Sequence, residues 1–219
     1  MITLEQVANH GGTRVFLKQA DANLGAIGYT EHGERHADLV ARRARYIMQS
    51  LGYPPETCEL AAIAGYIHDI GNAINRKTHG QASAFIAYHI LSDLGMEQEK
   101  IAEVMGAVAN HDEVEGDPVS PVACAVIIAD KSDVHRSRVR TLKEIDFDIH
   151  DRVNYAVKSS ALVVDSTKRT ITLQLEIDTE ISKVMEYFEI FLTRMLCCQR
   201  AAKVLNAEFK LVMNNTKIL

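Results

Sequence analysis

Apolar residues recur every three or four positions over most of the chain from about residue 13 to about residue 158. This spacing gathers them on one side of a helix and predicts a series of amphipathic helices around a shared core. Glycine or proline marks most of the expected ends, since glycine commonly follows a helix and proline is favoured in its first turn. The predicted helices span residues 32–51, 56–69, 78–95, 97–111 and 121–138.

The pattern changes near residue 150. Residues 170–177 alternate threonine, glutamine or glutamate with isoleucine or leucine, which is the period of a half-buried strand. The other expected elements are a hairpin partner at 161–164, a long helix at about 179–206 and a candidate third strand at 207–213. The sequence therefore predicts a mainly α fold, with a helical domain over residues 1–150 and a small α+β tail over residues 151–219.

Composition narrows the expected function and location. Of the 219 residues, 47% are hydrophobic and 24% are charged, and the net charge of −5 argues against a nucleic-acid polymer as partner. No apolar run is long enough to cross a membrane and no signal-peptide pattern is present, so we expect a cytoplasmic protein without a membrane partner. The cysteines lie in apolar stretches and predict buried thiols without disulfides: Cys58, Cys124, Cys197 and Cys198.

Several strongly polar residues interrupt the apolar faces of these helices. His36 shares its face with Val40 and Ile47, and Asp130 follows Val126 on its own apolar face. A buried carboxylate is costly unless it is paired or bound to a cation. Groups from several helices remove that cost by converging on a metal ion, and imidazole with carboxylate suits iron, manganese, zinc and similar ions.

The order of these residues resembles a known family. His36, the dipeptide His68–Asp69 and Asp130, with the phrases YIHDIGN, ANHDE and IIADKSD, are similar to the H…HD…D pattern of the HD-domain superfamily of metal-dependent phosphohydrolases. The resemblance covers roughly residues 30–140 and implies an HD-domain helical bundle. Small bacterial HD hydrolases that cleave dinucleoside polyphosphates are the most similar subgroup, although the tail does not match them. The GYP signature of the cyclic-dinucleotide phosphodiesterases is absent.

Two further histidines extend the resemblance to the H…HD…H…H…D type, which holds a second metal ion. By that likeness the metal ligands are His36, His68, Asp69, His79, His111 and Asp130. Asp69 would bridge the ions, and His79 with His111 would hold the second. The likeness implies one or two divalent ions, with two favoured, and leaves iron, manganese, magnesium, zinc and nickel as candidates. His32 lies one turn before His36 and competes with it, but the apolar residues at i+3 and i+4 favour His36.

The implied chemistry is attack by water on a phosphate, since a bound divalent ion lowers the pKa of its water towards about 7. The expected catalytic residues are Asp69, Asp130, Lys131 and Asp133. Asp133 would orient a ligand or move protons, and Asp112 is a further candidate for that role. The expected substrate-binding cations are Arg76, Lys77 and Lys131, with Lys131 preferred because it adjoins Asp130.

The remaining histidines and the tail have ordinary structural interpretations. His10, His89, His135 and His150 are expected to be structural or exposed. The basic run at residues 135–140 is expected to be a solvated helix face, or else to ring the mouth of the pocket. The hairpin carries no identifiable chemistry and is assigned to packing or to homodimerisation through the tail.

The leading functional prediction is hydrolysis of a small phosphorylated substrate, for which a nucleotide is the expected form. The bond cleaved would be a phosphate ester or a phosphoanhydride. One alternative is a di-iron HD oxygenase, because the same six ligands resemble those of enzymes that use iron and oxygen to cleave carbon–carbon or carbon–phosphorus bonds. Another is a non-catalytic sensor that binds a nucleotide and signals through the tail, although the intact ligand set argues against it.

Overall fold

Helices form the N-terminal part of the chain, as the apolar spacing predicts. The computed structural model describes residues 1–141 and 148–219. The α-helices are α1 (Leu4–Asn9), α2 (Gly11–Ala26), α3 (Glu34–Ser50), α4 (Pro55–Ile67), α5 (His79–Asp93), α6 (Gln98–Ala109) and α7 (Pro121–Lys131). Two short 3-10 helices, η1 (Ile70–Ala73) and η2 (Arg136–Arg138), lie between and after them, and α8 (Ile149–Ala156) leads into a sheet.

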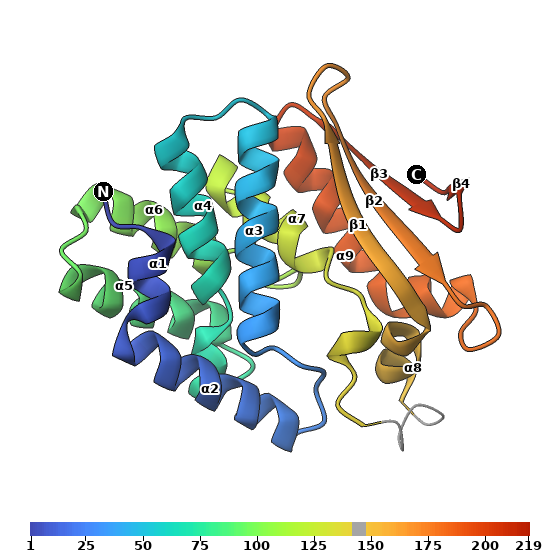
Figure 1. Ribbon diagram of the computed structural model, residues 1–219, viewed down its shortest axis with the longest axis horizontal. Helices are drawn as coiled ribbons and strands as arrows, with labels where there is room; N and C mark the ends of the chain where they lie inside the picture. The colour runs from blue at the N-terminus through green and yellow to red at the C-terminus, as the bar shows by residue number, and fades with distance from the viewer. Residues whose placement is uncertain (142–147) are drawn as a thin grey trace.

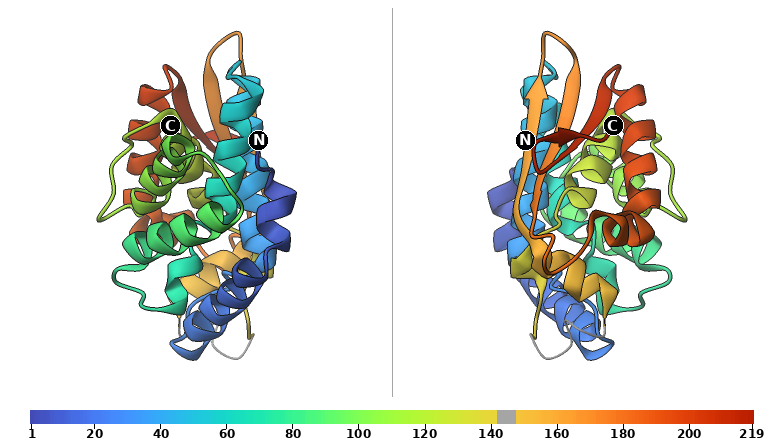
Figure 2. Two further views of the ribbon diagram at one scale, coloured as in Figure 1. Left: turned by 90° about the vertical axis from the view of Figure 1, so that its left-hand side faces the viewer. Right: turned by 90° about the vertical axis from the view of Figure 1, so that its right-hand side faces the viewer.

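The C-terminal part combines this sheet with one long helix (Figure 1). Its elements are β1 (Val157–Asp165), β2 (Thr170–Ile177), α9 (Val184–Val204), β3 (Glu208–Met213) and β4 (Thr216–Lys217). Strand β2 pairs antiparallel with β1 and parallel with β3, and α9 provides the crossover that a parallel pair needs. Helix α9 packs against both β3 and α7, so the sheet forms a layer on one flank of the helices (Figure 2). The predicted mainly α fold with an α+β appendage is confirmed, including the third strand.

Two predicted helices are shorter than the apolar pattern suggests. The helix expected over 121–138 ends at Lys131, because the Ser132 hydroxyl bonds back to the Ala129 carbonyl and Asp133 turns out of the helical path. The helix expected from residue 179 begins at Val184. A turn precedes it, in which the N–H groups of residues 181 and 182 both bond to the carbonyl of Asp178.

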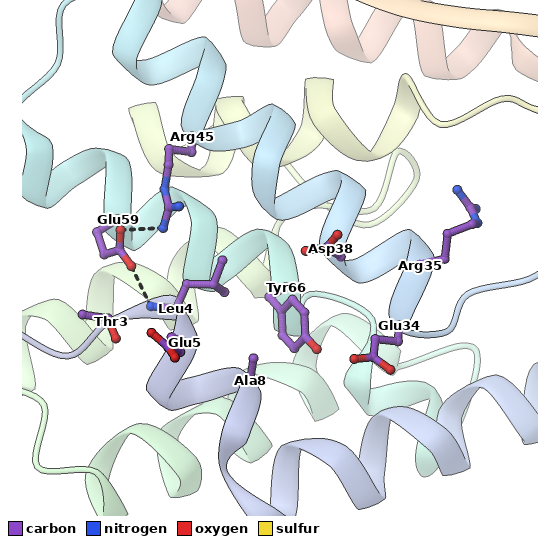
Figure 3. A pocket seen from close by; sticks show the side chains of 10 residues that line it. All are labelled: Thr3, Leu4, Glu5, Ala8, Glu34, Arg35, Asp38, Arg45, Glu59 and Tyr66. Carbon is purple, nitrogen blue, oxygen red and sulfur yellow. Dashed lines mark hydrogen bonds and ion pairs between the residues drawn. The ribbon is translucent and has the colours of Figure 1, made fainter.

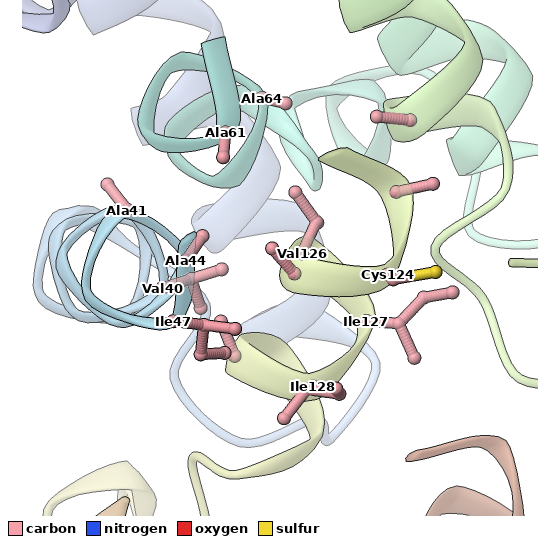
Figure 4. Close-up of a cluster of buried hydrophobic side chains, with 14 of the residues drawn as sticks. Val40, Ala41, Ala44, Ile47, Ala61, Ala64, Cys124, Val126, Ile127 and Ile128 are labelled. Carbon is pink, nitrogen blue, oxygen red and sulfur yellow. The ribbon is translucent and has the colours of Figure 1, made fainter. Parts of the chain in front are cut away.

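Helices α3, α4 and α7 meet in one part of the buried core. Helix α3 contributes Val40 and Ile47, helix α4 contributes Ala61, and helix α7 contributes Val126 to one buried cluster (Figure 4). All the cysteines are buried and free of disulfides, as predicted. None of the helices in the described part of the chain combines the length and hydropathy that a membrane crossing requires.

Candidate metal centre

Close packing of α3 on α4 brings two of the predicted ligands together. Gly65 makes the approach possible, because a Cβ there would lie 3.2 Å from the backbone nitrogen and Cα of Ala41. His36, in the first turn of α3, and His68, at the end of α4, are therefore neighbours, with Nε2 atoms 3.3 Å apart. Both side chains are fully buried.

Two carboxylates complete this half of the site, which we call the Asp130 side: His36, His68, Asp130 and the Oδ2 atom of Asp69. Asp130, from α7, places Oδ1 3.4 Å from His36 Nε2 and 3.7 Å from His68 Nε2. Asp69 Oδ2 lies 3.8 Å and 3.4 Å from the same two nitrogens. The ligand atoms of His36, His68 and Asp130 all lie within 4.8 Å of one another, so one ion fits among them.

The other oxygen of Asp69 faces a second pair of histidines, and these three groups form the His79 side. Asp69 Oδ1 lies 3.4 Å from His79 Nε2 and 3.6 Å from His111 Nε2, and the two nitrogens are 3.0 Å apart. Gly71 lets η1 lie against the start of α5, because a Cβ there would fall 2.2 Å from the carbonyl oxygen of His79. Asp69 thus lies between two histidine pairs, as a bridging ligand would.

The rings of three of these histidines are oriented from behind by backbone carbonyls. The Nδ1 atoms of His68, His79 and His111 lie 2.7, 2.8 and 2.6 Å from the carbonyl oxygens of Gly65, Arg76 and Val108. A carbonyl only accepts, so each Nδ1 carries a proton and each Nε2 faces the centre, where it binds a metal ion once it is unprotonated. Two facing nitrogens repel each other unless a proton or a metal cation lies between them. The donor set therefore fits metal ions held by ligands whose orientation is fixed by outer hydrogen bonds.

His36 is oriented by a carboxylate instead. Its Nδ1 lies 2.7 Å from Asp133 Oδ2, and Arg35 Nη2 donates to the same oxygen at 2.9 Å. Arg138 Nη1 donates to the main-chain oxygen of Asp133 at 2.8 Å. Burial favours the neutral acid, but Arg138, His36 and Arg35 together hold the pKa of Asp133 well below its usual range. Asp133 thus lies where the sequence analysis expects a group that orients a ligand.

Lys131 is held between two carboxylates. Its Nζ lies 2.6 Å from Asp130 Oδ2 and 2.6 Å from Glu113 Oε2, and Glu113 in turn accepts from Arg194 Nε at 2.9 Å. Burial would lower the pKa of Lys131, but Asp130 and Glu113 raise it, so the ammonium group stays charged. Its position makes it the counter-charge of Asp130, and direct contact with substrate phosphate stays a prediction.

The two sides shift the pKa values of their histidines in opposite directions. Burial alone would lower the pKa of His68, but the two adjacent carboxylates outweigh it and raise that pKa to about 10. Burial lowers the pKa of His79 to about 4, because the opposing effect of Asp69 is weaker and neighbouring positive groups add to the lowering. The Asp130 side therefore attracts positive charge more strongly than the His79 side.

A cavity of about 420 Å³ adjoins the centre, and we call it the arginine cavity after its lining residues Arg76, Arg138 and Arg194. Arg76 joins it to the His79 side, since Arg76 Nη1 lies 3.3 Å from His79 Nε2. The sequence predicts Arg76 and leaves open that the basic run at residues 135–140, which contains Arg138, rings the mouth of the pocket, but it gives no sign of Arg194. Lys77 is exposed and lines a different cavity with Asn75, so the structure brings only one of these two loop cations to the centre.

The histidines that were not assigned as metal ligands lie outside the two ligand groups. His32 lines the arginine cavity with its ring centroid 5.3 Å from that of His36, and its Nδ1 lies 2.7 Å from the Thr30 carbonyl oxygen. His10 caps α2, His135 caps η2, and His89 and His150 are exposed. Asp112 Oδ2 lies 3.9 Å from His79 Nε2, while its Oδ1 accepts from the backbone of Val114.

A larger cavity, of about 800 Å³, lies where α1 meets α3 and α4 (Figure 3). Glu59 closes its inner wall by accepting from the Leu4 N–H at 2.6 Å and pairing with Arg45. Glu34 and Tyr66 lie further along it. None of the predicted site residues lines this cavity, so its size does not make it the catalytic pocket.

Comparison with known proteins agrees with the geometry. The family model of the HD domain matches residues 33–134, which contain every predicted metal ligand. Residues 33–134 therefore form an HD domain, and the predicted family, a superfamily of metal-dependent phosphohydrolases, is confirmed for this segment. A curated relative, uncharacterized protein MJ1020 of Methanocaldococcus jannaschii, is 25% identical over 201 residues, covering 80% of this chain and 76% of that protein.

Proposed function

We propose that this protein is a metal-dependent phosphohydrolase with two metal ions, which cleaves a phosphate ester or a nucleotide phosphoanhydride in a small substrate. The observation that carries the proposal is the position of Asp69 between two pairs of histidines, with every Nε2 atom turned towards it. A buried carboxylate among imidazole nitrogens suits divalent cations. The arginine cavity supports a phosphorylated substrate, because guanidinium groups recognise phosphate.

The ligands divide between the ions by their distances. His36, His68 and Asp130 would hold one ion, His79 and His111 the other, and Asp69 would bridge them. Divalent ions bound there would supply a nucleophile by lowering the pKa of water and would neutralise phosphoryl charge.

The residues around the predicted ligands fix their orientation and balance their charge. Asp133 accepts a hydrogen bond from Nδ1–H of His36 and so leaves Nε2 free to bind an ion. Lys131 offsets the negative charge of Asp130. Without this cation, Asp130 and Asp69 would be two buried carboxylates with less positive charge beside them. Arg76 lies at the boundary between the His79 side and the cavity, which supports a role for it in binding a phosphate oxygen.

Metal analysis of the purified protein, paired with a phosphate-release screen over nucleotides and simple phosphate esters, tests the proposal. We expect two ions per chain and metal-dependent release of phosphate. Oxygen consumption by the iron-loaded protein, without phosphate release, would identify di-iron oxygenase chemistry instead. Turnover at background level with full metal occupancy would favour the sensor function and contradict the proposal.

A further inference from the structure

The walls of the arginine cavity come mostly from outside the HD segment. Arg76 and Glu113 are its lining residues within 33–134, whereas the other lining residues precede residue 33 or follow residue 134. Helix α9 contributes Phe191 and Arg194. The segment that matches the family therefore supplies the metal ligands, while the flanking parts of this chain shape the space beside them.

Arg138 is a buried cation with an unused donor. Its side chain is 4% exposed, its Nε donates to the Glu31 carbonyl at 3.2 Å, and its Nη1 donates to the Asp133 carbonyl at 2.8 Å. Its Nη2 has no hydrogen-bond partner among the described residues. An unpaired donor on a buried guanidinium is costly, and an anion in the cavity that Arg138 lines would remove that cost.

Arg194 offers a second cation, from helix α9. Its hydrogen bond to Glu113 uses Nε, at 2.9 Å, and its Cζ lies 4.7 Å from the centroid of the Phe191 ring. These contacts fix the guanidinium plane while the side chain stays 25% exposed at the cavity. A fixed, planar guanidinium is suited to phosphate oxygens.

Asn154, on α8, has the opposite requirement. The residue is 4% exposed, and its Nδ2 donates to the His150 carbonyl at 2.8 Å. Its Oδ1 has no partner among residues 1–141 and 148–219, although Asn154 lines the same cavity. A fully ionised phosphate has no donor for this oxygen, whereas a hydroxyl group does.

We infer that the arginine cavity binds a phosphate monoester whose organic part carries hydroxyl groups. Arg138 and Arg194 take the phosphate, and Asn154 Oδ1 accepts from a hydroxyl. The volume of about 420 Å³ is within the range of about 300–1,000 Å³ typical of small-molecule sites and suits a ligand of mononucleotide size. The inference rests on the proposed function for delivery of the phosphate to the metal ions, but binding itself requires no turnover.

The test measures binding to the metal-free protein by calorimetry, with adenosine 5′-monophosphate as the hydroxyl-bearing probe and p-nitrophenyl phosphate as the probe without hydroxyls. Arg138→Lys should weaken both about 10- to 100-fold, since it removes a charged hydrogen bond. Asn154→Leu should weaken only the adenosine 5′-monophosphate complex, about 3- to 10-fold. The matched control is Arg136→Gln, in the same basic run but stacked on Tyr155 outside the cavity, and it should change neither.

Hydrogen exchange on the unmodified protein keeps the inference testable if a variant fails to fold. Adenosine 5′-monophosphate should slow exchange in α8 and around residues 190–194 of α9. No protection there, or binding by both folded variants equal to that of the control, would overturn the inference. If Arg138→Lys and Asn154→Leu both leave phosphate release unchanged, the inference about the cavity is wrong but the proposed function stands. Binding in the cavity without hydrolysis of any ester overturns the proposed function alone.

Discussion

The Asp130 side and the His79 side share Asp69 but hold their histidines by different means. On the Asp130 side, His36 is oriented by the Asp133 carboxylate, and two carboxylate oxygens face the histidine pair. On the His79 side, both histidines are oriented by neutral backbone carbonyls and share one oxygen of Asp69. Since carboxylates attract cations more strongly than neutral groups do, we expect the Asp130 side to bind its ion more tightly. The difference lies in His36, because His68 on the Asp130 side is oriented by a backbone carbonyl as both histidines of the His79 side are.

Replacing Asp69, which both sides share, should abolish ion binding on both sides. Asp69→Asn takes a carboxylate oxygen from each, so we expect loss of both ions and at least about 100-fold loss of phosphate release, more than the loss of an outer partner causes. Plasma mass spectrometry and phosphate assays measure the two effects. Asp38→Asn, on the exposed face of α3, is the control and should retain both ions. Full metal content in Asp69→Asn would contradict the bridging role.

Removing a ligand of one side should expose the asymmetry. His79→Ala should lower the metal content from two ions to one per chain, because the Asp130 side keeps all its ligands. The exposed His89 on the same helix provides the control His89→Ala, which should keep both. If His79→Ala retains two ions, the assignment of His79 is wrong.

Substitution of a residue that contacts a metal-binding histidine from outside should also lower ion affinity more on the Asp130 side than on the His79 side. Asp133→Asn lets the new amide donate to His36 Nδ1 and favours the tautomer that cannot bind through Nε2, so the affinity of the tighter ion should fall about 10- to 100-fold. The matched change on the other side is Asp112→Asn, which lies 3.9 Å from His79 Nε2 and should have little effect. Competition with a chelator measures both affinities. Equal effects of the two changes would refute the proposed asymmetry.

The smallest expected effect is in proton release at about pH 7.5. The pKa of His68 in the metal-free protein is raised to about 10, so its proton must leave when an ion binds, whereas His79, with its pKa lowered to about 4, is already neutral. The stabilisation from protonated His68 is complete below its ordinary pKa of 6.5 and is lost as pH rises through about 10. Calorimetry in two buffers should show about one proton released on the Asp130 side. Release of none there would contradict the comparison.

The ligand order could be predicted because the required residues interrupt apolar faces. His36 and Asp130 are polar groups on otherwise buried stripes, and this signal exists in the sequence itself. The structure brings these residues together with His68, Asp69, His79 and His111. The assignment of each to an ion and to catalysis stays a prediction.

Among the cavity arginines, Arg194 could not be predicted, and Arg138 only as one of two alternatives for its basic run, for a physical reason. Arg138 follows a helix that ends earlier than its apolar pattern suggests, and Arg194 lies on an amphipathic helix where a cation ordinarily faces solvent. Only the packing of α9 on α7 turns Arg194 towards Glu113. Lys131, expected at the substrate, is instead enclosed between Asp130, its neighbour on α7, and Glu113.

The contact between Glu113 and Arg194 constrains how this chain could evolve. A different C-terminal segment, exchanged for α9, would have to provide a cation at the same place or leave Glu113 with Lys131 as its one counter-charge. Lys131 would then be drawn from Asp130 towards Glu113, and the metal ligand would lose part of its electrostatic support. We therefore expect replacement of α9 to disturb the candidate metal centre more than junctions placed within loops do.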